Sequence, residues 1–263
     1  MKNISFYILL ITTASCSESK KETVDNQLNL IRYTVQRTWP HDTKAFTEGL
    51  LIHKGELYES TGESESWIGV VNVKTGEVNK KVELDKKYFG EGITILNNKV
   101  YQLTYKTREG FVYSLPGFEK IRTFTYDTEG WGLTHNGEHL IMSVGTDKLY
   151  FLDTTNLKVV RTMNVTYRGE PLKELNELEF VNGSIFANVW RTDMIARIDA
   201  ATGVADGFLE LSELTSQARM INSRSDVLNG IAWHPGSKSL LVTGKYWPLI
   251  YILKLEETPA PNQ

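Results

Sequence analysis

Short runs of β-branched and aromatic residues, separated by turns rich in Gly, Asn and Asp, recur along most of the chain. Such runs are typical of short strands. The spacing of apolar residues indicates a helix only at residues 214–221, inside a longer connection between residues 210 and 227. The pattern therefore predicts an all-β protein with one helical insertion, and connections of that length in compact domains tend to be functional.

The predicted strands form a repeat with a period of roughly 40 to 50 residues, as in a β-propeller. Each unit begins with a short apolar run, followed by a turn and a second strand. The five starts are Glu48-Gly49-Leu50, Glu91-Gly92-Ile93, Trp131-Gly132-Leu133, Asn176-Glu177-Leu178 and Asn229-Gly230-Ile231.

The fifth unit runs out of chain after its third strand, whereas the first four units each have a fourth strand. Residues 31–38 alternate in polarity as an outer strand does, and they can supply the missing strand. Pairing the two ends of the chain would leave few open sheet edges. We therefore predict a five-bladed β-propeller over residues 30–256, closed by an N-terminal strand that completes the last blade.

A propeller brings equivalent positions of its inner strands together at one end of the central channel. Acidic, basic and aromatic side chains that converge in such a place favour a small-ligand site, although each one taken alone is typical of an ordinary loop. The glycines on both sides of Glu91 are expected to let another molecule come close. The aligned positions hold Glu48, Glu91, Trp131, Asn176 and Asn229 on first strands, and Gly62, Tyr105, Gly145, Trp190 and Lys245 at the ends of second strands.

The N-terminus has the pattern of an export signal. A basic start is followed by an apolar run over residues 4–13, which is too short to span a bilayer as a mature helix. The run ends in Thr13-Ala14-Ser15-Cys16, which resembles a bacterial lipobox with Thr13 where leucine is usual. Residues 1–16 are thus predicted to be a lipoprotein-type signal peptide ending at the lipidated Cys16. The alternative is a free cysteine in a discarded signal peptide.

Beyond Cys16, residues 17–29 are polar and charged and predict a flexible tether, and residues 257–263 predict a disordered tail. We expect an exported monomer in the bacterial cell envelope, periplasmic or at the cell surface, held to the membrane by Cys16 only. The net charge of −3 over 263 residues gives no indication of a nucleic-acid partner. The choice between inner and outer membrane stays open.

Seven motifs, in order, carry a family resemblance. They are residues 45–50 (AFTEGL), 89–94 (FGEGIT), 129–134 (EGWGLT), 176–179 (NELE), 187–190 (ANVW), 228–232 (LNGIA) and 243–248 (TGKYWP). The chain resembles the plant-type glutaminyl-peptide cyclotransferases, also called glutamine cyclotransferases, from about residue 33 to residue 255. The resemblance implies a five-bladed propeller that converts the N-terminal glutamine of a peptide or protein to pyroglutamate with release of ammonia, without metal or cofactor.

In that reaction the substrate's α-amine attacks its own side-chain carboxamide, so one carboxylate can take up the proton of the amine and protonate the leaving ammonia. The resemblance implies Glu91 as this shuttle. Lys245 and Asn176 are the candidate donors to the carboxamide oxygen as it gains negative charge. The predicted substrate-binding residues are Phe46, Glu48, Phe89, Tyr105, Trp131, Trp190 and Asn229.

Two positions depart from the plant pattern. Glu48 stands where the plant motif carries glutamine, and a second carboxylate near Glu91 would raise one of the two pKa values and help hold the substrate ammonium. Tyr105 stands where the plant motif carries tryptophan, and its ring can still stack while its hydroxyl can donate.

Two other functions fit the same residues. One is a metal-dependent propeller hydrolase of the lactonase kind, with oxygen ligands from Glu48, Glu91, Asn176 and Asn229. The other is a surface-displayed binding propeller without catalytic activity. Loss of activity in EDTA, reversed by calcium, would favour the hydrolase.

Overall fold

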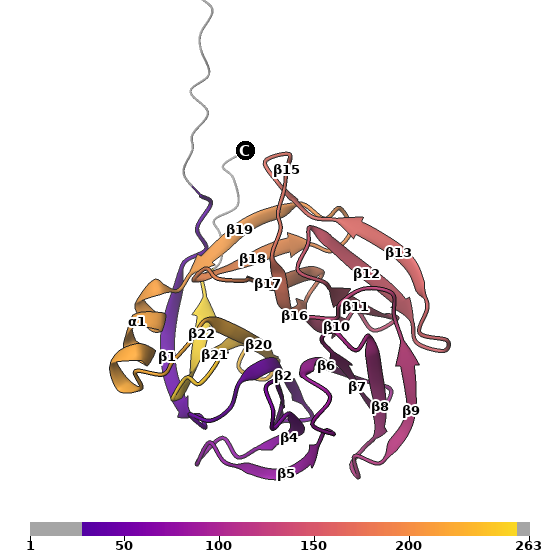
Figure 1. Ribbon diagram of the computed structural model, residues 1–263. Helices are drawn as coiled ribbons and strands as arrows, with labels where there is room; N and C mark the ends of the chain where they lie inside the picture. Colours follow the sequence, from indigo (N-terminus) through magenta and orange to yellow (C-terminus); the bar gives the residue numbers. More distant parts are fainter. Residues whose placement is uncertain (1–27, 257–263) are drawn as a thin grey trace, which may run out of the picture.

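The computed structural model describes residues 28–256, which form five four-stranded antiparallel sheets arranged as blades around a central axis (Figure 1). The predicted five-bladed propeller is confirmed. The signal peptide with Cys16, nearly all of the tether and the C-terminal tail fall at residues 1–27 and 257–263, outside the described residues. None of the helices within residues 28–256 is long and apolar enough to cross a membrane.

The blades follow one another along the chain, and each runs from the axis outwards. The first four are β2 (Thr47–His53), β3 (Glu56–Thr61), β4 (Trp67–Val71) and β5 (Val78–Glu83); β6 (Gly90–Leu96), β7 (Lys99–Thr104), β8 (Glu109–Ser114) and β9 (Lys120–Thr125); β10 (Leu133–His135), β11 (His139–Ser143), β12 (Lys148–Asp153) and β13 (Val159–Asn164); and β16 (Leu175–Val181), β17 (Ser184–Val189), β18 (Met194–Asp199) and β19 (Ala205–Glu210). The fifth is β20 (Leu228–His234), β21 (Ser239–Gly244), β22 (Leu249–Leu255) and, outermost, β1 (Tyr33–Pro40).

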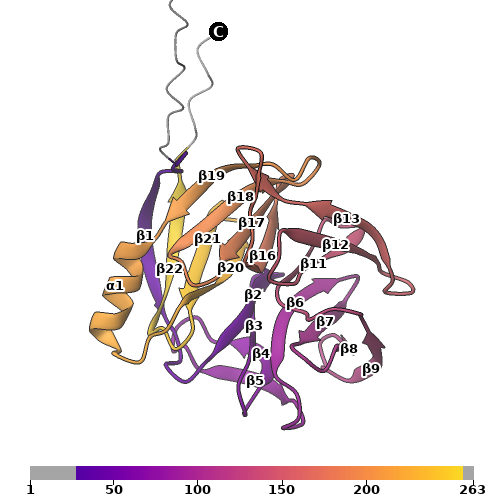
Figure 2. The same ribbon diagram turned by 45° about the horizontal axis from the view of Figure 1, so that its top comes forward.

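The closing strand β1 pairs antiparallel with β22 along its whole length, with a bulge between Val35 and Arg37. It begins at Tyr33 rather than at the predicted residue 31 because the preceding residues pair elsewhere. Leu30 forms a parallel bridge with Phe208 of β19, and the Ile31 N–H donates to the Phe208 carbonyl at 2.8 Å. The N-terminal segment therefore touches the fourth blade before it completes the fifth (Figure 2).

The predicted helical insertion is present as α1 (Ser212–Ile221), which packs beside β1 (Figure 1). Its buried residues Leu214, Thr215 and Ala218 lie on one face, as their spacing requires. A short hairpin of β14 (Thr166–Tyr167) and β15 (Glu170–Pro171), between the third and fourth blades, has no counterpart in the predicted repeat.

The core lies between neighbouring blades. Leu50 and Leu57 of the first blade, for example, pack with Leu241 and Ile250 of the fifth, and all four are nearly inaccessible to solvent. Full burial of one such side chain stabilises the fold by about 1.5–3 kcal/mol. Because each blade buries its faces against its neighbours, the inner strands are held in a closed ring and their ends are fixed relative to one another.

Candidate active site

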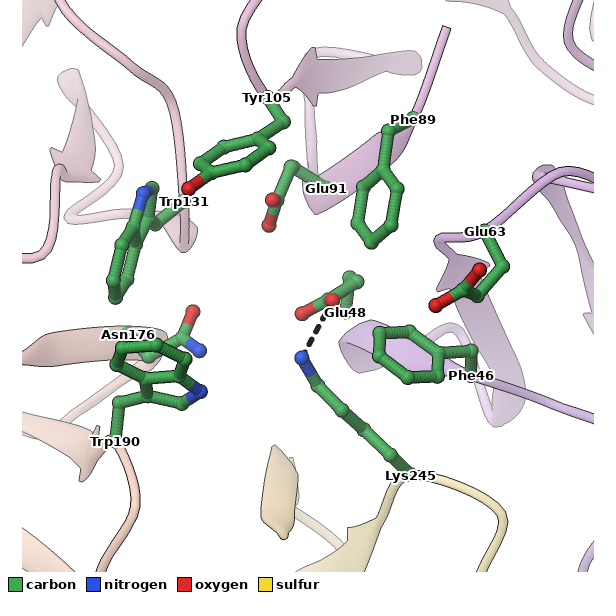
Figure 3. A pocket seen from close by; sticks show the side chains of 10 residues that line it. All are labelled: Phe46, Glu48, Glu63, Phe89, Glu91, Tyr105, Trp131, Asn176, Trp190 and Lys245. Atoms are coloured by element: carbon green, nitrogen blue, oxygen red, sulfur yellow. Dashed lines mark hydrogen bonds and ion pairs between the residues drawn. The ribbon is translucent and has the colours of Figure 1, made fainter. Parts of the chain in front are cut away.

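A cavity of about 240 Å³ opens at the end of the ring where the inner strands begin (Figure 3). Side chains from all five blades or the segments that join them surround it. Its lining consists of Phe46, Glu48, Glu63, Phe89, Glu91, Tyr105, Trp131, Asn176, Trp190 and Lys245. The structure thus brings together nine of the ten residues that the sequence placed in the site, all but Asn229, and adds Glu63.

The polar side chains of the inner strands sit at bulges. The pairing of β2 with β3 shifts register between Thr47 and Gly49, at Glu48, and that of β6 with β7 shifts between Gly90 and Ile93, around Glu91. Bulges re-aim the side chains that they carry. The inner strands that hold Asn176 and Asn229 shift in the same places. The aligned positions therefore share a backbone distortion as well as a place in the repeat.

The glycines beside Glu91 serve the packing of the ring. A Cβ atom on Gly90 would lie 2.4 Å from the Thr61 carbonyl oxygen, and one on Gly92 would lie 2.4 Å from the Leu133 nitrogen. The Gly92 N–H donates to the Trp131 carbonyl of the next blade at 2.7 Å. The sequence-based explanation, that these glycines leave room for an approaching molecule, is therefore wrong, because neighbouring backbone fills that room.

Glu91 is a buried carboxylate, 5% exposed, and no group within residues 28–256 donates a hydrogen bond to its side chain. Burial raises its pKa well above the ordinary value, and the negative charge of Glu48 raises it further, while Lys245 acts in the opposite direction. A carboxylate so placed holds a proton more readily than a solvated one and has free oxygen atoms with which to exchange it with a bound ligand.

Glu48 is held on both oxygens. Its Oε1 forms an ion pair with Lys245 Nζ at 2.6 Å, and its Oε2 accepts a hydrogen bond from Asn229 Nδ2 at 2.9 Å. Burial raises the pKa of Glu48 to about 7, although Lys245 and Asn229 favour the charged form. Asn229 is fully buried and positions Glu48 instead of lining the cavity, so a direct contact with substrate stays a prediction.

Lys245 and Asn176 keep further hydrogen-bonding capacity. The Lys245 ammonium lies 4.3 Å from the centre of the Phe46 ring, and only Glu48 accepts a hydrogen bond from it within residues 28–256. The Asn176 carboxamide points into the cavity (Figure 3), and its buried Oδ1 has no partner in the described part of the chain. Both groups are therefore free to bind a polar ligand.

Aromatic rings form a continuous half-buried wall above this polar floor. Neighbouring rings meet edge to face or tilted, an arrangement that adds about 0.5–1.5 kcal/mol per pair beyond area burial. The centroid distances are 5.1 Å for Tyr246–Phe46, 5.8 Å for Phe46–Phe89, 5.9 Å for Phe89–Tyr105, 6.4 Å for Tyr105–Trp131 and 5.3 Å for Trp131–Trp190. The wall favours ligands with apolar segments and excludes water from the floor.

Glu63, Glu129 and Tyr246 were not among the predicted site residues, although Glu63 lines the cavity and the other two contact its aromatic wall. Glu129 Oε2 accepts from the Trp131 indole at 3.3 Å, and burial together with Glu129 raises the pKa of Tyr105. Glu129 and Tyr246 both stand inside motifs already noted, next to predicted site residues. Glu63 directly follows the aligned strand end at Gly62, and that adjacency was the available signal.

The residues proposed for a metal in the lactonase-like alternative are two carboxylates, Glu48 and Glu91, and two carboxamides, Asn176 and Asn229. Within residues 28–256, no three His, Cys, Asp or Glu side chains are grouped as metal ligands. Both oxygens of Glu48 already have partners in Lys245 and Asn229.

Comparison with known proteins finds similar sequences and a similar crystal structure over most of the chain. The sequence model of the family described as glutamine cyclotransferase matches residues 7–255. A glutaminyl-peptide cyclotransferase of Arabidopsis thaliana is 37% identical over 260 residues, which cover 97% of this chain and 81% of the relative. The crystal structure of Myxococcus xanthus glutaminyl cyclase matches with a TM-score of 0.82 and 33% identity, over 88% of this chain and 99% of that one. The residues matched by the family model include the whole cavity lining.

Proposed function

The chain belongs to the glutamine cyclotransferase family, and on this premise we propose that it converts the N-terminal glutamine of peptides or proteins to pyroglutamate, with Glu91 as the proton shuttle and without a metal ion. The proposed role of Glu91 rests on its state in the cavity. It is a buried carboxylate with a raised pKa and no hydrogen-bond donor of its own among the described residues.

The first step is the attack of the substrate α-amine on the carbon of its own γ-carboxamide. The aromatic wall packs on the methylene groups of glutamine and favours the folded conformer in which these two atoms meet, which replaces a bimolecular encounter by an intramolecular one. Glu91 accepts a proton from the attacking nitrogen as the new C–N bond forms. The α-ammonium of a peptide, with a pKa of about 7.7–8.0, first loses a proton to solvent, and the neutral amine that results is the attacking nucleophile.

Negative charge then develops on the carboxamide oxygen. The Lys245 ammonium and the Asn176 carboxamide are the donors at the cavity floor that can stabilise it, and such donors often supply the largest catalytic contribution. In the second step Glu91 returns its proton to the departing nitrogen, the C–N bond of the carboxamide breaks and ammonia leaves. Glu91 ends as it began, so the proton balance closes in one turnover.

The direct test is incubation of the purified chain with Gln-Ala, followed by measurement of ammonia and of the mass loss of the peptide. We expect turnover that is unchanged after the protein is treated with EDTA. Absence of product from a folded sample would contradict the cyclotransferase activity. Activity lost in EDTA and restored by calcium would contradict metal independence.

We also propose that the protein is exported and anchored to the bacterial envelope through a lipid on Cys16. The support is the sequence pattern of residues 1–16. Metabolic labelling with radioactive palmitate should label the wild type and not Cys16→Ser, and a wild type recovered without label would refute the anchor.

A further inference from the structure

Glu63 is an exposed carboxylate at the mouth of the cavity. The other two carboxylates of the lining differ from it, because Glu48 is 2% exposed and Glu91 is 5% exposed. In Figure 3 the Glu63 carboxylate lies next to Phe46 and points towards the centre of the cavity. The cavity therefore has two acidic groups in its floor and a third at its entrance.

The loop that carries Glu63 is tied to the catalytic strand. Ser66 Oγ donates to the Glu63 carbonyl at 2.7 Å and accepts from the Gly90 N–H, next to Glu91, at 2.9 Å. The Ser66 carbonyl accepts from the Leu84 N–H at 2.9 Å. These bonds hold the backbone of Glu63 in place relative to Glu91.

The charge of Glu63 is not neutralised within the described part of the chain, where no Lys, Arg or His forms an ion pair with it. Besides the buried Lys245 at Phe46, two exposed cations contact the aromatic wall from other blades. Lys106 lies 5.0 Å from the centre of the Tyr105 ring, and the Arg191 guanidinium lies 4.1 Å from that of Trp190. Glu63 thus makes the mouth acidic beside the first blade, whereas Lys106 and Arg191 lie beside the second and fourth, with Glu129 between them at Trp131.

We propose that Glu63 binds a basic side chain just after the N-terminal glutamine, so that substrates beginning Gln-Lys or Gln-Arg are preferred. This proposal rests on the proposed function. If the glutamine occupies the cavity with its amine at Glu91, the peptide must leave through the mouth. The second residue, whose Cα lies about 3.8 Å from that of the first, then has its side chain at the entrance.

The experiment compares kcat/KM for Gln-Lys-Ala, Gln-Ala-Ala and Gln-Glu-Ala at low ionic strength. Exposed ion pairs are worth about 0.2–1 kcal/mol, so we expect the lysine peptide to exceed the alanine peptide by roughly 1.4- to 5-fold. Glu63→Gln should bring this ratio close to one, and Glu63→Lys should favour the glutamate peptide. Roughly 0.5 M salt should reduce the wild-type ratio by screening.

The ratio is the decisive quantity because Glu63 also raises the pKa of Glu48, and a change there alters the rate on all three peptides together. Glu65→Gln is the matched control, since Glu65 is exposed in the same loop and lies outside the cavity lining. This variant should keep the wild-type ratio and rate.

Two negative results would have different meanings. If no peptide is converted, the proposed function fails. If the alanine peptide is converted but the wild type shows no preference for lysine, or if Glu63→Gln keeps the wild-type preference, only the role of Glu63 fails.

Discussion

Buried carboxylates lie both in the cavity and within the ring, and they differ in their partners. Within the ring, Glu177 accepts hydrogen bonds from the Ile231 N–H at 2.8 Å and the Leu50 N–H at 3.3 Å, which belong to two other blades. Glu59 accepts from Thr47 Oγ1 at 2.7 Å and from His41 Nε2 at 3.1 Å. In the cavity, Glu91 has no donor within residues 28–256.

The paired carboxylates stabilise the fold, whereas the unpaired one is available for a reaction. A buried polar group without a partner costs free energy, so most such groups in folded proteins are paired. Glu177 and Glu59 follow this rule: Glu177 connects blades that are distant in sequence, and Glu59 joins the first blade to the segment after the closing strand. Glu91 departs from it, and its free lone pairs are what a proton shuttle needs. Four predictions test this distinction, from the largest expected effect to the smallest.

Glu91→Gln removes the proposed proton shuttle and keeps a side chain of nearly the same shape. We expect kcat on Gln-Ala to fall by about 10²- to 10⁴-fold, the usual contribution of a general acid–base group. The melting temperature should not fall, because the variant loses no hydrogen bond made by the Glu91 side chain in the described chain. Ammonia release and thermal unfolding followed by circular dichroism measure the two effects. A loss of less than about ten-fold would remove Glu91 from its role.

His41→Ala breaks a fully buried pair that fastens the end of the closing strand to the first blade. His41 Nδ1 donates to the Trp247 carbonyl at 2.8 Å, and its Nε2 donates to Glu59. Leaving the carboxylate of Glu59 buried without its partner should cost about 3–5 kcal/mol in free energy of unfolding. His139→Ala is the control, because the His139–Glu138 pair lies at the surface and should contribute far less.

This effect should depend on pH. Burial lowers the pKa of His41, but the charge and hydrogen bond of Glu59 outweigh it, so the pKa is raised above its ordinary value. The folded protein then holds the His41 proton more tightly than the unfolded chain. The stabilisation is fully present below the ordinary pKa of about 6.5 and is lost as pH rises through the folded pKa. Denaturant titrations should show the gap between wild type and His41→Ala narrowing as pH rises; a constant gap would contradict a charged pair.

Glu177→Gln gives the contrast to Glu91→Gln. One of its two backbone donors, on Leu50 or Ile231, would face an amide NH₂ instead of an acceptor. We expect a loss of about 1–3 kcal/mol in the free energy of unfolding, the cost of an unpaired buried donor. The folded fraction should retain kcat. A large fall in kcat at full stability would mean that the two carboxylates are not distinct in role.

Glu48→Gln should shift the pH dependence more than the rate. The negative charge of Glu48 raises the pKa of Glu91. Lys245 lowers that pKa, and it would do so more strongly if its charge were no longer paired with Glu48. Both changes lower the pKa of Glu91. The acid limb of the kcat/KM profile should therefore move to lower pH in the variant. A limb that stays in place would indicate that another group sets it.

The sequence by itself determined the ring of blades and most of the residues that surround Glu91. A repeat of four strands can be recognised without tertiary information, because the alternation of apolar and polar residues along a strand indicates which of its faces is buried. A closed ring then forces equivalent positions such as Glu48, Glu91 and Lys245 to one end. The pattern also predicted the closing strand, but not that residues 30–31 pair with β19 first.

Only the tertiary structure decided which buried groups are paired. Glu91 and Glu177 both lie at bulges of inner strands, Glu177 one position beyond the Glu91 equivalent Asn176, but this offset does not reveal which donors each carboxylate meets. Their difference depends on donors that come from other blades, as when Leu50 reaches Glu177 across 127 positions of the sequence. Periodicity encodes burial locally, whereas hydrogen-bond partners are set by how the blades pack. For the same reason, only the folded structure shows that Asn229 binds Glu48 and that Glu63 lies at the mouth of the cavity.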